Sequence, residues 1–473
     1  MNKKTSIIIG VAAACAAVAF GAYAAMNEDM TGKPYSEIEA YKAEHPKVNV
    51  TYTVTVDGTE PPVELSNEDL TLTLSHREQL DSCMAQAEYL QNLETLDLGD
   101  ISLRPFELQA VQEKFSDAEL LFNKINFLGK TYDRNTKSVD LSDVTGQDID
   151  EAAVLLSLLP NLKEVNLNQD GVSAIVLDDA AKLQAAVPEV FFTYTTTLFG
   201  QEISTDMERV EYFQVHIGDE GLPQFRTLLP LMQNLTYLRL DWCDTTDEAM
   251  AQLRDDFPEI KVVWRIFFNQ FNCLTDTYRL WATYSVKEWE TGPLKYCTEV
   301  RYLDLGHNRI KTIDFCNYMP HLEVVILAET MVEDLTPLRN CPEITFLELF
   351  GNGRLADISG VEALTKLEHL NMTRLRHVTD ISPIMHLENL QRMYCSPYCP
   401  EEQMQEFIDL HPDCETQFYY GDSTATGWRY RGGVRVPRYA LLGKQIGYDI
   451  SDFSIYPKGY LDHEINSLDD PIK

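Results

Sequence analysis

Apolar residues return at a fixed spacing along the second half of the chain. The stretch VRYLDLGHNRI places them at Val300, Leu303, Leu305 and Ile310, with an asparagine at Asn308. The order apolar-x-x-apolar-x-apolar then begins again in steps of 22, 22, 23 and 23 residues, at Leu322, Ile344, Leu367 and Leu390. The alternation predicts a short strand in each copy. A fixed period of this length predicts an array of stacked coils.

The stacking of these coils explains the residue types. Leu303 and Leu305 should point inward and pack on Val325 and Leu327 of the next coil, about 4.8 Å away. Asn308 can bond the backbone of its own turn, which satisfies polar groups that would otherwise be buried without partners.

The array extends backwards with longer coils. Matching strands begin at Leu93, Leu162, Val210 and Leu235, and Cys243 stands where Asn308 stands in its own coil. Helix-like runs separate these strands, such as GQDIDEAAVLLSLLP and TTDEAMAQLRDDFP, and both end at a proline. Proline disfavours helix in the residue before it, so we expect one helix in each long coil.

A second period of about 70 residues overlies the first. Four β-rich runs begin near Pro46, Ser116, Pro188 and Pro258, in steps of 70, 72 and 70 residues. About 12 residues into these runs come turn signals, at Gly58, Gly129, Gly200 and Asn269. We therefore expect a β-hairpin in each run.

The coil motif resembles the L-x-x-L-x-L-x-x-N/C signature of the leucine-rich repeat family. The links VEDLTPL, LADISGV and VTDISPI look like the short repeats of internalin-type bacterial cell-surface proteins. The resemblance implies a curved α/β solenoid with a parallel β ladder on its concave face. Helices should cover the convex face first, and 3-10 segments or turns later.

This interpretation divides the chain into five segments. They are a signal peptide or signal anchor at 1–25, a linker or cap at 26–44, the long-repeat solenoid with hairpin inserts at 45–290, the short-repeat solenoid with a C-terminal helix at 291–418, and a basic, aromatic cap or tail at 419–473.

The N-terminus predicts export. Lys3 and Lys4 precede an uncharged run from Ser6 to Ala25. The run fits a cleaved signal peptide, with small residues at Ala22 and Ala24. Its 20 residues are also just long enough for an uncleaved membrane anchor. A lipoprotein modified at Cys15 is the third alternative, and all three place the protein outside the cytoplasm.

The charge excludes one class of partner. The 473 residues carry a formal net charge of −35. Neutralising phosphates requires a face rich in lysine and arginine, so nucleic acid is not expected as a partner. Membrane contact is expected only through the N-terminal segment, if it stays uncleaved.

The sequence contains none of the common catalytic or nucleotide-binding motifs. We therefore expect no enzyme activity and no cofactor. Nine cysteines follow the signal segment. Cys395, Cys399 and Cys414 could form a disulfide, a metal site or buried free thiols. An enzyme using these three thiols is a remote alternative.

In the leucine-rich repeat family, ligands commonly lie on the concave face, where the x positions of the motif point outward. The resemblance implies a ligand-binding surface made of such positions and of residues directly after the strands. It comprises Tyr212, His216, Tyr237, Arg239, Asp241, Trp242, Tyr302, Asp304, Ile326, Phe346, Phe350, His369, Arg392 and Tyr394. Aromatic residues and arginine are typical of interface hot spots. Val324, Ile326 and Phe346 are expected to form an exposed apolar patch.

The tail reverses the charge of the chain. The stretch from Gly427 to Lys444 carries five positive charges and no acid. Arg429, Arg431, Arg435 and Arg438 could form a strip for an anionic partner. Alternatively, the tail is a cap that folds back on the acidic solenoid, because repeat arrays need capped ends.

The function favoured by the resemblance is non-catalytic recognition of a protein or glycan outside the cell. The alternative is an envelope scaffold that binds a sister protein of the same cell. The oligomeric state and the ligand's identity are not predicted.

Overall fold

The computed structural model describes residues 27–421 and 423–447. The chain divides into two compact units, Met1–Thr196 and Thr197–Lys473. The segment predicted to be a signal peptide or anchor lies outside the described residues. Within the described residues, no helix has both the length and the apolar character needed to cross a membrane.

The first unit contains the coil strands of the early long repeats. They form two parallel sheets, one of β5 (Thr71–Thr73), β6 (Thr95–Asp97) and β7 (Glu119–Leu121), the other of β10 (Ser138–Asp140), β11 (Glu164–Asn166) and β14 (Phe191–Thr193). The middle residue of each strand is buried, as in Leu96 and Val165. The flanking residues are partly or largely exposed, so the central apolar side chain is the fully buried one in each of these strands.

Helices connect these strands. They are α3 (Arg77–Ala85), α4 (Pro105–Lys114), α5 (Ile149–Ser157) and α6 (Leu177–Ala186), with the 3-10 segment η1 (Ala87–Leu90) after α3. Each buries one side, for example Leu108 and Val111 of α4. The unit begins with β1 (Asn27–Asp29), α2 (Tyr35–Glu44) and β2 (Asn49–Thr51), and β1 pairs with β2 in parallel.

Strand pairs joined by short turns lie between the coils. They are β3 (Thr53–Val56) with β4 (Val63–Ser66), β8 (Lys124–Phe127) with β9 (Lys130–Asp133), β15 (Thr195–Leu198) with β16 (Gln201–Ser204), and β19 (Lys261–Phe268) with β20 (Phe271–Leu274). In the second, Leu128 and Gly129 both have positive φ, as a tight two-residue hairpin turn requires. A further short pair, β12 (Asn168–Gln169) with β13 (Val172–Ser173), was not expected from the sequence.

Two larger sheets lie in the described part of the second unit. Parallel strands β17 (Arg209–Phe213), β18 (Tyr237–Asp241) and β19 form the first, which β20 extends. The second sheet has seven strands in sequence order: β21 (Arg279–Trp281), β22 (Tyr302–Asp304), β23 (Val324–Ile326), β24 (Phe346–Glu348), β25 (His369–Met372), β26 (Arg392–Cys395) and β27 (Glu415–Phe418). All its neighbouring strands are parallel.

The connections shorten where the repeat shortens. Helices α7 (Gly218–Leu228), followed by η2 (Leu229–Leu231), and α8 (Asp247–Asp256) serve the longer coils. The 22- and 23-residue coils use 3-10 segments instead: η3 (Glu288–Glu290), η4 (Gly292–Tyr296), η5 (Asp314–Tyr318), η6 (Thr336–Asn340), η7 (Ser359–Ala363) and η8 (Ser382–Ile384). Helix α9 (Glu401–Leu410) precedes the last strand.

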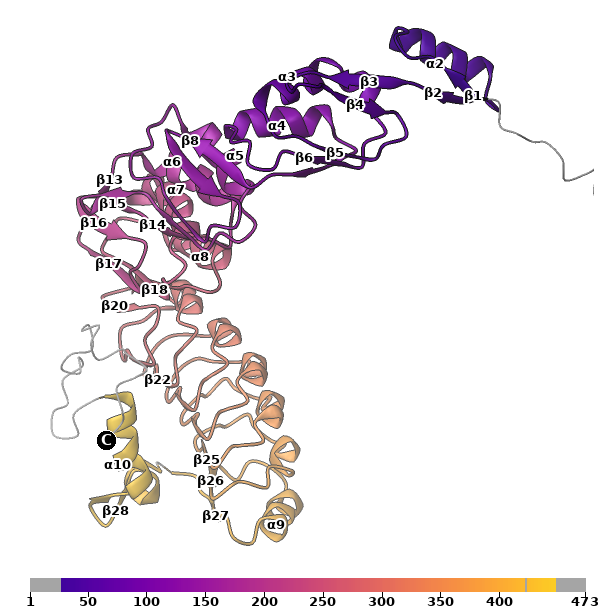
Figure 1. Ribbon diagram of the computed structural model, residues 1–473. Helices are drawn as coiled ribbons and strands as arrows, with labels where there is room; N and C mark the ends of the chain where they lie inside the picture. Colours follow the sequence, from indigo (N-terminus) through magenta and orange to yellow (C-terminus); the bar gives the residue numbers. More distant parts are fainter. Residues whose placement is uncertain (1–26, 422, 448–473) are drawn as a thin grey trace, which may run out of the picture. The chain divides into compact units, whose positions relative to one another are not determined.

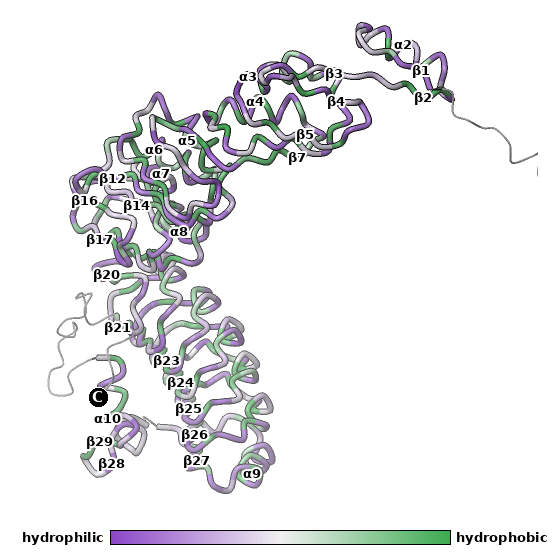
Figure 2. The backbone as a smooth tube through the Cα atoms, viewed as in Figure 1, coloured by the Kyte–Doolittle hydropathy of each residue, from purple (hydrophilic) through white to green (hydrophobic). Residues whose placement is uncertain are grey.

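The recurring aspartate of the links starts these 3-10 segments. Asp334 accepts a bond from the Thr336 N–H (2.7 Å), and Asp357 and Asp380 do the same for Ser359 and Ser382 (2.7 and 2.9 Å). A short acceptor side chain that holds an N–H two residues on stabilises a turn. Hydrophobic segments recur in every coil from β21 to β27 (Figure 2), and Leu303, Leu305, Val325 and Leu327 are fully buried as expected.

The predicted asparagine positions bond more than their own turns. Asn308 donates to Leu305 O in its own coil (2.9 Å) and to Ala282 O in the preceding coil (2.6 Å). Asn352 likewise donates to Leu349 O (2.9 Å) and Leu327 O (2.7 Å). Each asparagine therefore ties two neighbouring coils together.

The described part of the tail contains β28 (Tyr430–Arg431), β29 (Val434–Arg435) and α10 (Pro437–Ile446). Figure 1 shows α10 returning beside the seven-stranded sheet, where it contacts β21 and β22. Residues 423–447 are called the docking segment below.

Candidate functional site on the strand face of the second unit

The strand face that points away from the leucine core carries two rows of side chains on the short coils. The register aligns Tyr302, Val324, Phe346, His369 and Arg392 in one row. It aligns Asp304, Ile326, Glu348, Asn371 and Tyr394 in the other. This is the face that the sequence predicts to bind a ligand.

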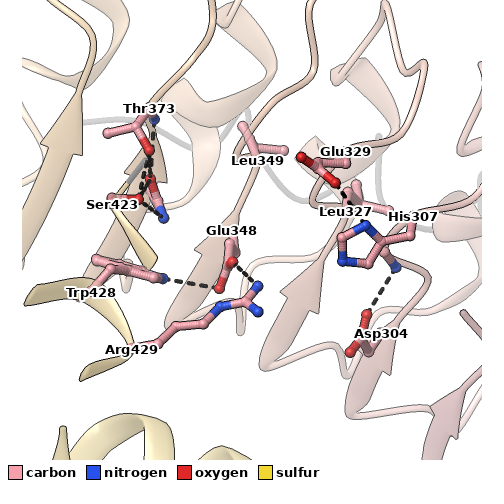
Figure 3. A network of polar contacts seen from close by, with 12 residues as sticks. Asp304, His307, Leu327, Glu329, Glu348, Leu349, Thr373, Ser423, Trp428 and Arg429 are labelled. Carbon is pink, nitrogen blue, oxygen red and sulfur yellow. Dashed lines mark hydrogen bonds and ion pairs between the residues drawn. The ribbon is translucent and has the colours of Figure 1, made fainter. Parts of the chain in front are cut away.

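The docking segment covers these rows. The Trp428 ring lies 5.5 Å from the Phe346 ring and 5.3 Å from the Tyr394 ring, measured between centroids. Its indole nitrogen donates to Glu348 Oε2 (2.9 Å). Trp428 is fully buried, although 80 residues separate it from Glu348 in sequence. Figure 3 shows Glu348 accepting bonds from both Trp428 and Arg429.

Two carboxylates lie beneath the segment. Glu348 is 1% exposed and forms an ion pair with Arg429. Asp304, 8% exposed, accepts the Gly306 N–H at 2.9 Å. Burial raises the pKa of Asp304 to about 7, and this effect outweighs the bond from Gly306 and the charge of Arg429. A positively charged segment therefore lies over an acidic floor.

Helix α10 supplies the apolar part of the cover. Its residues Tyr439, Leu442 and Ile446 share one buried cluster with side chains of the strand rows, which include Tyr302, Val324, Ile326, Phe346 and Tyr394. The guanidinium carbon of Arg438 lies 5.1 Å from the centre of the Phe346 ring. Such placement of a cation over a ring is attractive.

Polar contacts hold the other edge of the segment. Ser423 exchanges hydrogen bonds with Asn371 (3.1 Å) and Thr373 (2.7 Å). Arg392 Nη2 donates to Gly427 O (2.6 Å) and Trp428 O (3.3 Å), and its guanidinium lies 4.6 Å from the Trp428 ring.

These contacts change the interpretation of half of the predicted surface. The expected exposed patch of Val324, Ile326 and Phe346 is wrong, because α10 covers all three. Eight predicted ligand residues on the short coils are buried in this structure: Tyr302, Asp304, Ile326, Phe346, Phe350, His369, Arg392 and Tyr394. Burial together with the nearby Arg438 and Arg392 lowers the pKa of His369 to about 4.

The four arginines of the predicted anionic strip do not form one exposed strip. Arg429 pairs with Glu348, and Arg438 lies over Phe346. Arg435 lies beside Tyr430 and Tyr439. Arg431 is largely exposed and pairs with Glu415. The contacts are those of a segment that folds back on the solenoid.

The buried cluster that contains the docking segment does not include residues of the sheet formed by β17, β18, β19 and β20. Three large aromatic side chains lie about half exposed on or next to its strands: Phe213 at 54%, Trp242 at 45% and Phe267 at 47%. The Trp242 and Phe267 rings meet edge to face at 4.9 Å. Phe213 lies opposite Asp241, the residue before Trp242. These three residues are called the aromatic platform below.

An ordered polar floor lies beside the platform. Asp241 accepts two bonds from Arg265, at 2.7 and 3.0 Å, and neither residue is more than 9% exposed. Arg239 pairs with Glu211 at 2.5 Å. Tyr237 packs with Val263 and Leu274 on the same face. A bidentate, desolvated arginine–carboxylate pair fixes both side chains in one orientation.

Two predicted residues, Tyr212 in β17 and His216 after it, lie elsewhere. Tyr212 points into the core, against Phe225 and Phe199, and donates to Leu198 O (2.8 Å). The prediction for Tyr212 is therefore wrong by one register position, and Glu211 and Phe213 occupy the outer face. His216 lies beyond the strand end, exposed, and contacts Asp244 at 2.7 Å.

Sequence reasoning missed Phe213, Phe267 and Arg265. Phe267 and Arg265 alternate along the run KVVWRIFF, which was interpreted only as a hairpin strand. The alternation itself was the available signal, because it places both on the same face as Lys261 and Val263.

The cysteines are free thiols in this structure. All nine from Cys83 to Cys414 are unpaired, and all but Cys414 are buried. No group of three or more potential metal-ligating side chains occurs within residues 27–421 and 423–447. Two thiols approach each other, with Cys273 Sγ 3.8 Å from Cys297 Sγ.

No protein-family model and no curated protein matches this sequence. Solved structures do match. Internalin InlF from Listeria monocytogenes has 17% identity and a TM-score of 0.25, over 77% of this chain and 87% of that one. A leucine-rich repeat protein of Leptospira interrogans has 15% identity and a TM-score of 0.27, over 73% and 93%. The functional domain of InlJ from Listeria monocytogenes has 10% identity and a TM-score of 0.23, over 76% and 67%.

The chain is similar to internalin-type leucine-rich repeat proteins. The repeat itself is visible in the coils of this chain, whose strands, asparagines at Asn308 and Asn352, and leucine core follow the motif.

Proposed function

We propose that this protein is a non-catalytic recognition protein whose aromatic platform binds a protein partner. The observation that carries the proposal is the exposure of Phe213, Trp242 and Phe267 beside one another on an ordered strand face. Exposed apolar clusters of this kind mark interaction surfaces. Tryptophan and arginine are the residues that most often dominate binding energy.

The polar floor supports this proposal. Asp241, Arg265, Arg239 and Glu211 pair with one another, so the platform carries a fixed pattern of hydrogen-bonding groups. Rigid anchors reduce the entropy lost on binding. The predicted residues Tyr237, Arg239, Asp241 and Trp242 belong to this site.

The proposed location is outside the cytoplasm, secreted or anchored at the cell surface. The support is the basic, then uncharged N-terminal sequence up to Ala25. A partner from the same envelope would make the protein a scaffold, and a foreign partner would make it a receptor or adhesin. The identity of the captured partner separates these two cases.

The test is photo-crosslinking in intact producing cells, with a photoreactive amino acid in place of Phe267. One defined protein should be captured, and Trp242→Ala should abolish its capture. In direct binding, Trp242→Ala should cost about 2 kcal/mol or more.

A probe at Tyr318 is the matched control, because this residue is equally exposed but lies in η5. Equal capture from Tyr318 and Phe267, or capture unaffected by Trp242→Ala, would contradict the proposed site. Capture of a glycan instead of a protein would keep the site but change the ligand class.

A further inference from the structure

We propose that the strand face of the short coils is itself a peptide-binding site, for a basic segment with the order small residue, aromatic residue, arginine. In this structure residues 423–447 fill the site in cis. The inference concerns a different surface from the aromatic platform and does not depend on it.

The face is built for an incoming donor pair. Both hydrogen-bonding partners of the Glu348 carboxylate, the Trp428 indole and the Arg429 guanidinium, come from the docking segment. Phe346, Ile326 and Tyr394 belong to the apolar cluster that the segment covers, and Ile326 lies opposite Glu348 on the neighbouring strand. A buried carboxylate needs charged, hydrogen-bonding partners. Glu348 therefore specifies arginine beside an aromatic N–H.

The site also binds the backbone of its ligand. Arg392 Nη2 donates to the carbonyl oxygens of Gly427 and Trp428. Gly427 has a φ of +130°, and a Cβ atom there would lie 2.6 Å from the Tyr394 hydroxyl oxygen. The residue before the tryptophan must therefore be small, and glycine fits best. Gly427, Trp428 and Arg429 together define the recognised sequence.

Several buried nitrogens beneath and within the docked segment make no hydrogen bond among the described residues. His369 Nδ1, Arg392 Nε and Arg429 Nε are buried without a hydrogen bond among the described residues. Arg438 is held over an aromatic ring, where desolvation lowers its pKa. A partner segment that adds hydrogen bonds to His369 Nδ1 and Arg392 Nε would bind better than the cis segment does.

The experiment compares the wild-type full chain with a released variant carrying Trp428→Ala and Arg429→Ala. The probe is a fluorescently labelled synthetic peptide of residues 426–447, followed by anisotropy. The released variant should bind this peptide at least ten-fold more tightly than the wild-type chain, in which the cis segment competes. Adding Glu348→Gln to the released variant should remove the gain.

The matched control peptide carries the same Trp428→Ala and Arg429→Ala changes and keeps four of the five positive charges. It should bind at least ten-fold more weakly than the unchanged peptide. Equal binding of the two peptides would reduce the interaction to charge attraction and overturn the proposal. Failure of the peptide to bind a released variant with an intact circular dichroism spectrum would make the segment a fixed cap and overturn it as well.

A second measurement covers a released variant that does not fold. Hydrogen exchange of residues 426–447 in the wild-type chain is followed with excess isotopically heavy peptide. Faster exchange in the cis segment shows displacement and supports the proposal. Unchanged exchange at saturating peptide overturns it. Neither outcome affects the platform, whose test uses Trp242.

Discussion

The Trp428 indole nitrogen donates to Glu348 across 80 residues of sequence, at 2.9 Å. This bond, with the ion pair from Arg429 to the same carboxylate, fixes the docking segment on β24. Glu348→Gln keeps an acceptor for Trp428 but leaves the Arg429 charge unpaired, which is costly in a buried site. We expect trypsin to cleave the variant after Arg431 and Arg435 at least ten-fold faster than the wild type, measured by mass spectrometry.

Glu343→Gln is the control for that variant, because Glu343 also pairs with a cation, Lys366, but both are exposed. Its cleavage pattern should match the wild type. Equal cleavage of all three proteins would mean that the Glu348 charge does not hold the segment.

The Asp241–Arg265 pair predicts a large loss of stability when one partner is removed. Asp241→Ala removes both carboxylate bonds of the buried Arg265 guanidinium, whose Nη1 also donates to Asn272 Oδ1 at 2.7 Å. Breaking a buried pair costs about 3–5 kcal/mol. Urea unfolding should show a loss of this size. Lys366→Ala, which breaks an exposed pair, should lose about 0–1 kcal/mol, and a similar loss in both variants would contradict the burial of the first pair.

The hydrogen bonds of Asn352 between coils should contribute measurably to the free energy of unfolding. Asn352→Ala removes the donors to Leu327 O and Leu349 O and the acceptor of the Thr330 hydroxyl. A buried group left without its partner costs about 1–3 kcal/mol, so we expect thermal unfolding to show a loss of about 2–4 kcal/mol. Asn340→Ala, on the exposed 3-10 side, should cost less than about 0.5 kcal/mol. A loss at Asn352 no larger than this would show that its hydrogen bonds between coils add no stability.

Asp304 predicts a dependence of stability on pH. Its carboxyl pKa is 3.8 in an unfolded chain and about 7 in the folded protein, mainly because of burial. The folded state therefore binds the proton more tightly. The stability that this proton contributes is complete below about pH 4 and is lost as the pH rises through 7. Three pKa units correspond to about 4 kcal/mol.

Asp304→Asn tests this dependence and keeps an acceptor for the Gly306 N–H. The variant should be several kcal/mol more stable than the wild type at pH 8, and equal to it at pH 4, by thermal unfolding. Asp334→Asn should show the opposite sign at pH 8, because bonds from Thr336 lower the pKa of Asp334. Equal stability of wild type and Asp304→Asn at pH 8 would contradict the burial of a charge at this position.

His369 predicts a separate loss of stability in acid. Its pKa falls from 6.5 to about 4 because burial, Arg438 and Arg392 all disfavour the charged ring. A neutral ring in the folded state stabilises it above pH 6.5, and this stability is lost as the pH falls towards 4. His369→Gln should remove the loss of stability in acid. Its effect on stability at pH 8 should be smaller than that loss. Hydrogen exchange of α10, followed between pH 4 and 7 in the wild type and the variant, would measure the loss. Identical profiles of the two proteins would contradict the prediction.

The short coils were predictable from sequence because their signal is local. The leucines at Leu303 and Leu305 alternate with outward residues, and a strand can satisfy that order in only one register. In β17 the run VEYFQV offers apolar residues at consecutive positions, so two registers are possible. Tyr212 was placed on the wrong face for this reason.

The covered half of the site was not predictable in the same way. Contacts such as Trp428 with Phe346 join positions about 80 residues apart, and no spacing rule links them. The only sequence signal was the basic, aromatic composition after Gly427 in a chain of net charge −35. That signal indicated a tail that could fold back, but it did not indicate which coils the tail would touch.

The docking segment also limits how this array can evolve. Repeat arrays can usually gain coils by duplication or lose them by deletion, because each coil contacts only its neighbours. Here one segment contacts β21 and β22 through α10 and β26 through Trp428, in a single cluster with Tyr278 and Tyr394. An inserted coil would shift Glu348 away from Arg429 by about 4.8 Å. The length of the tail therefore matches the number of short coils. That number can change only if the tail changes length with it.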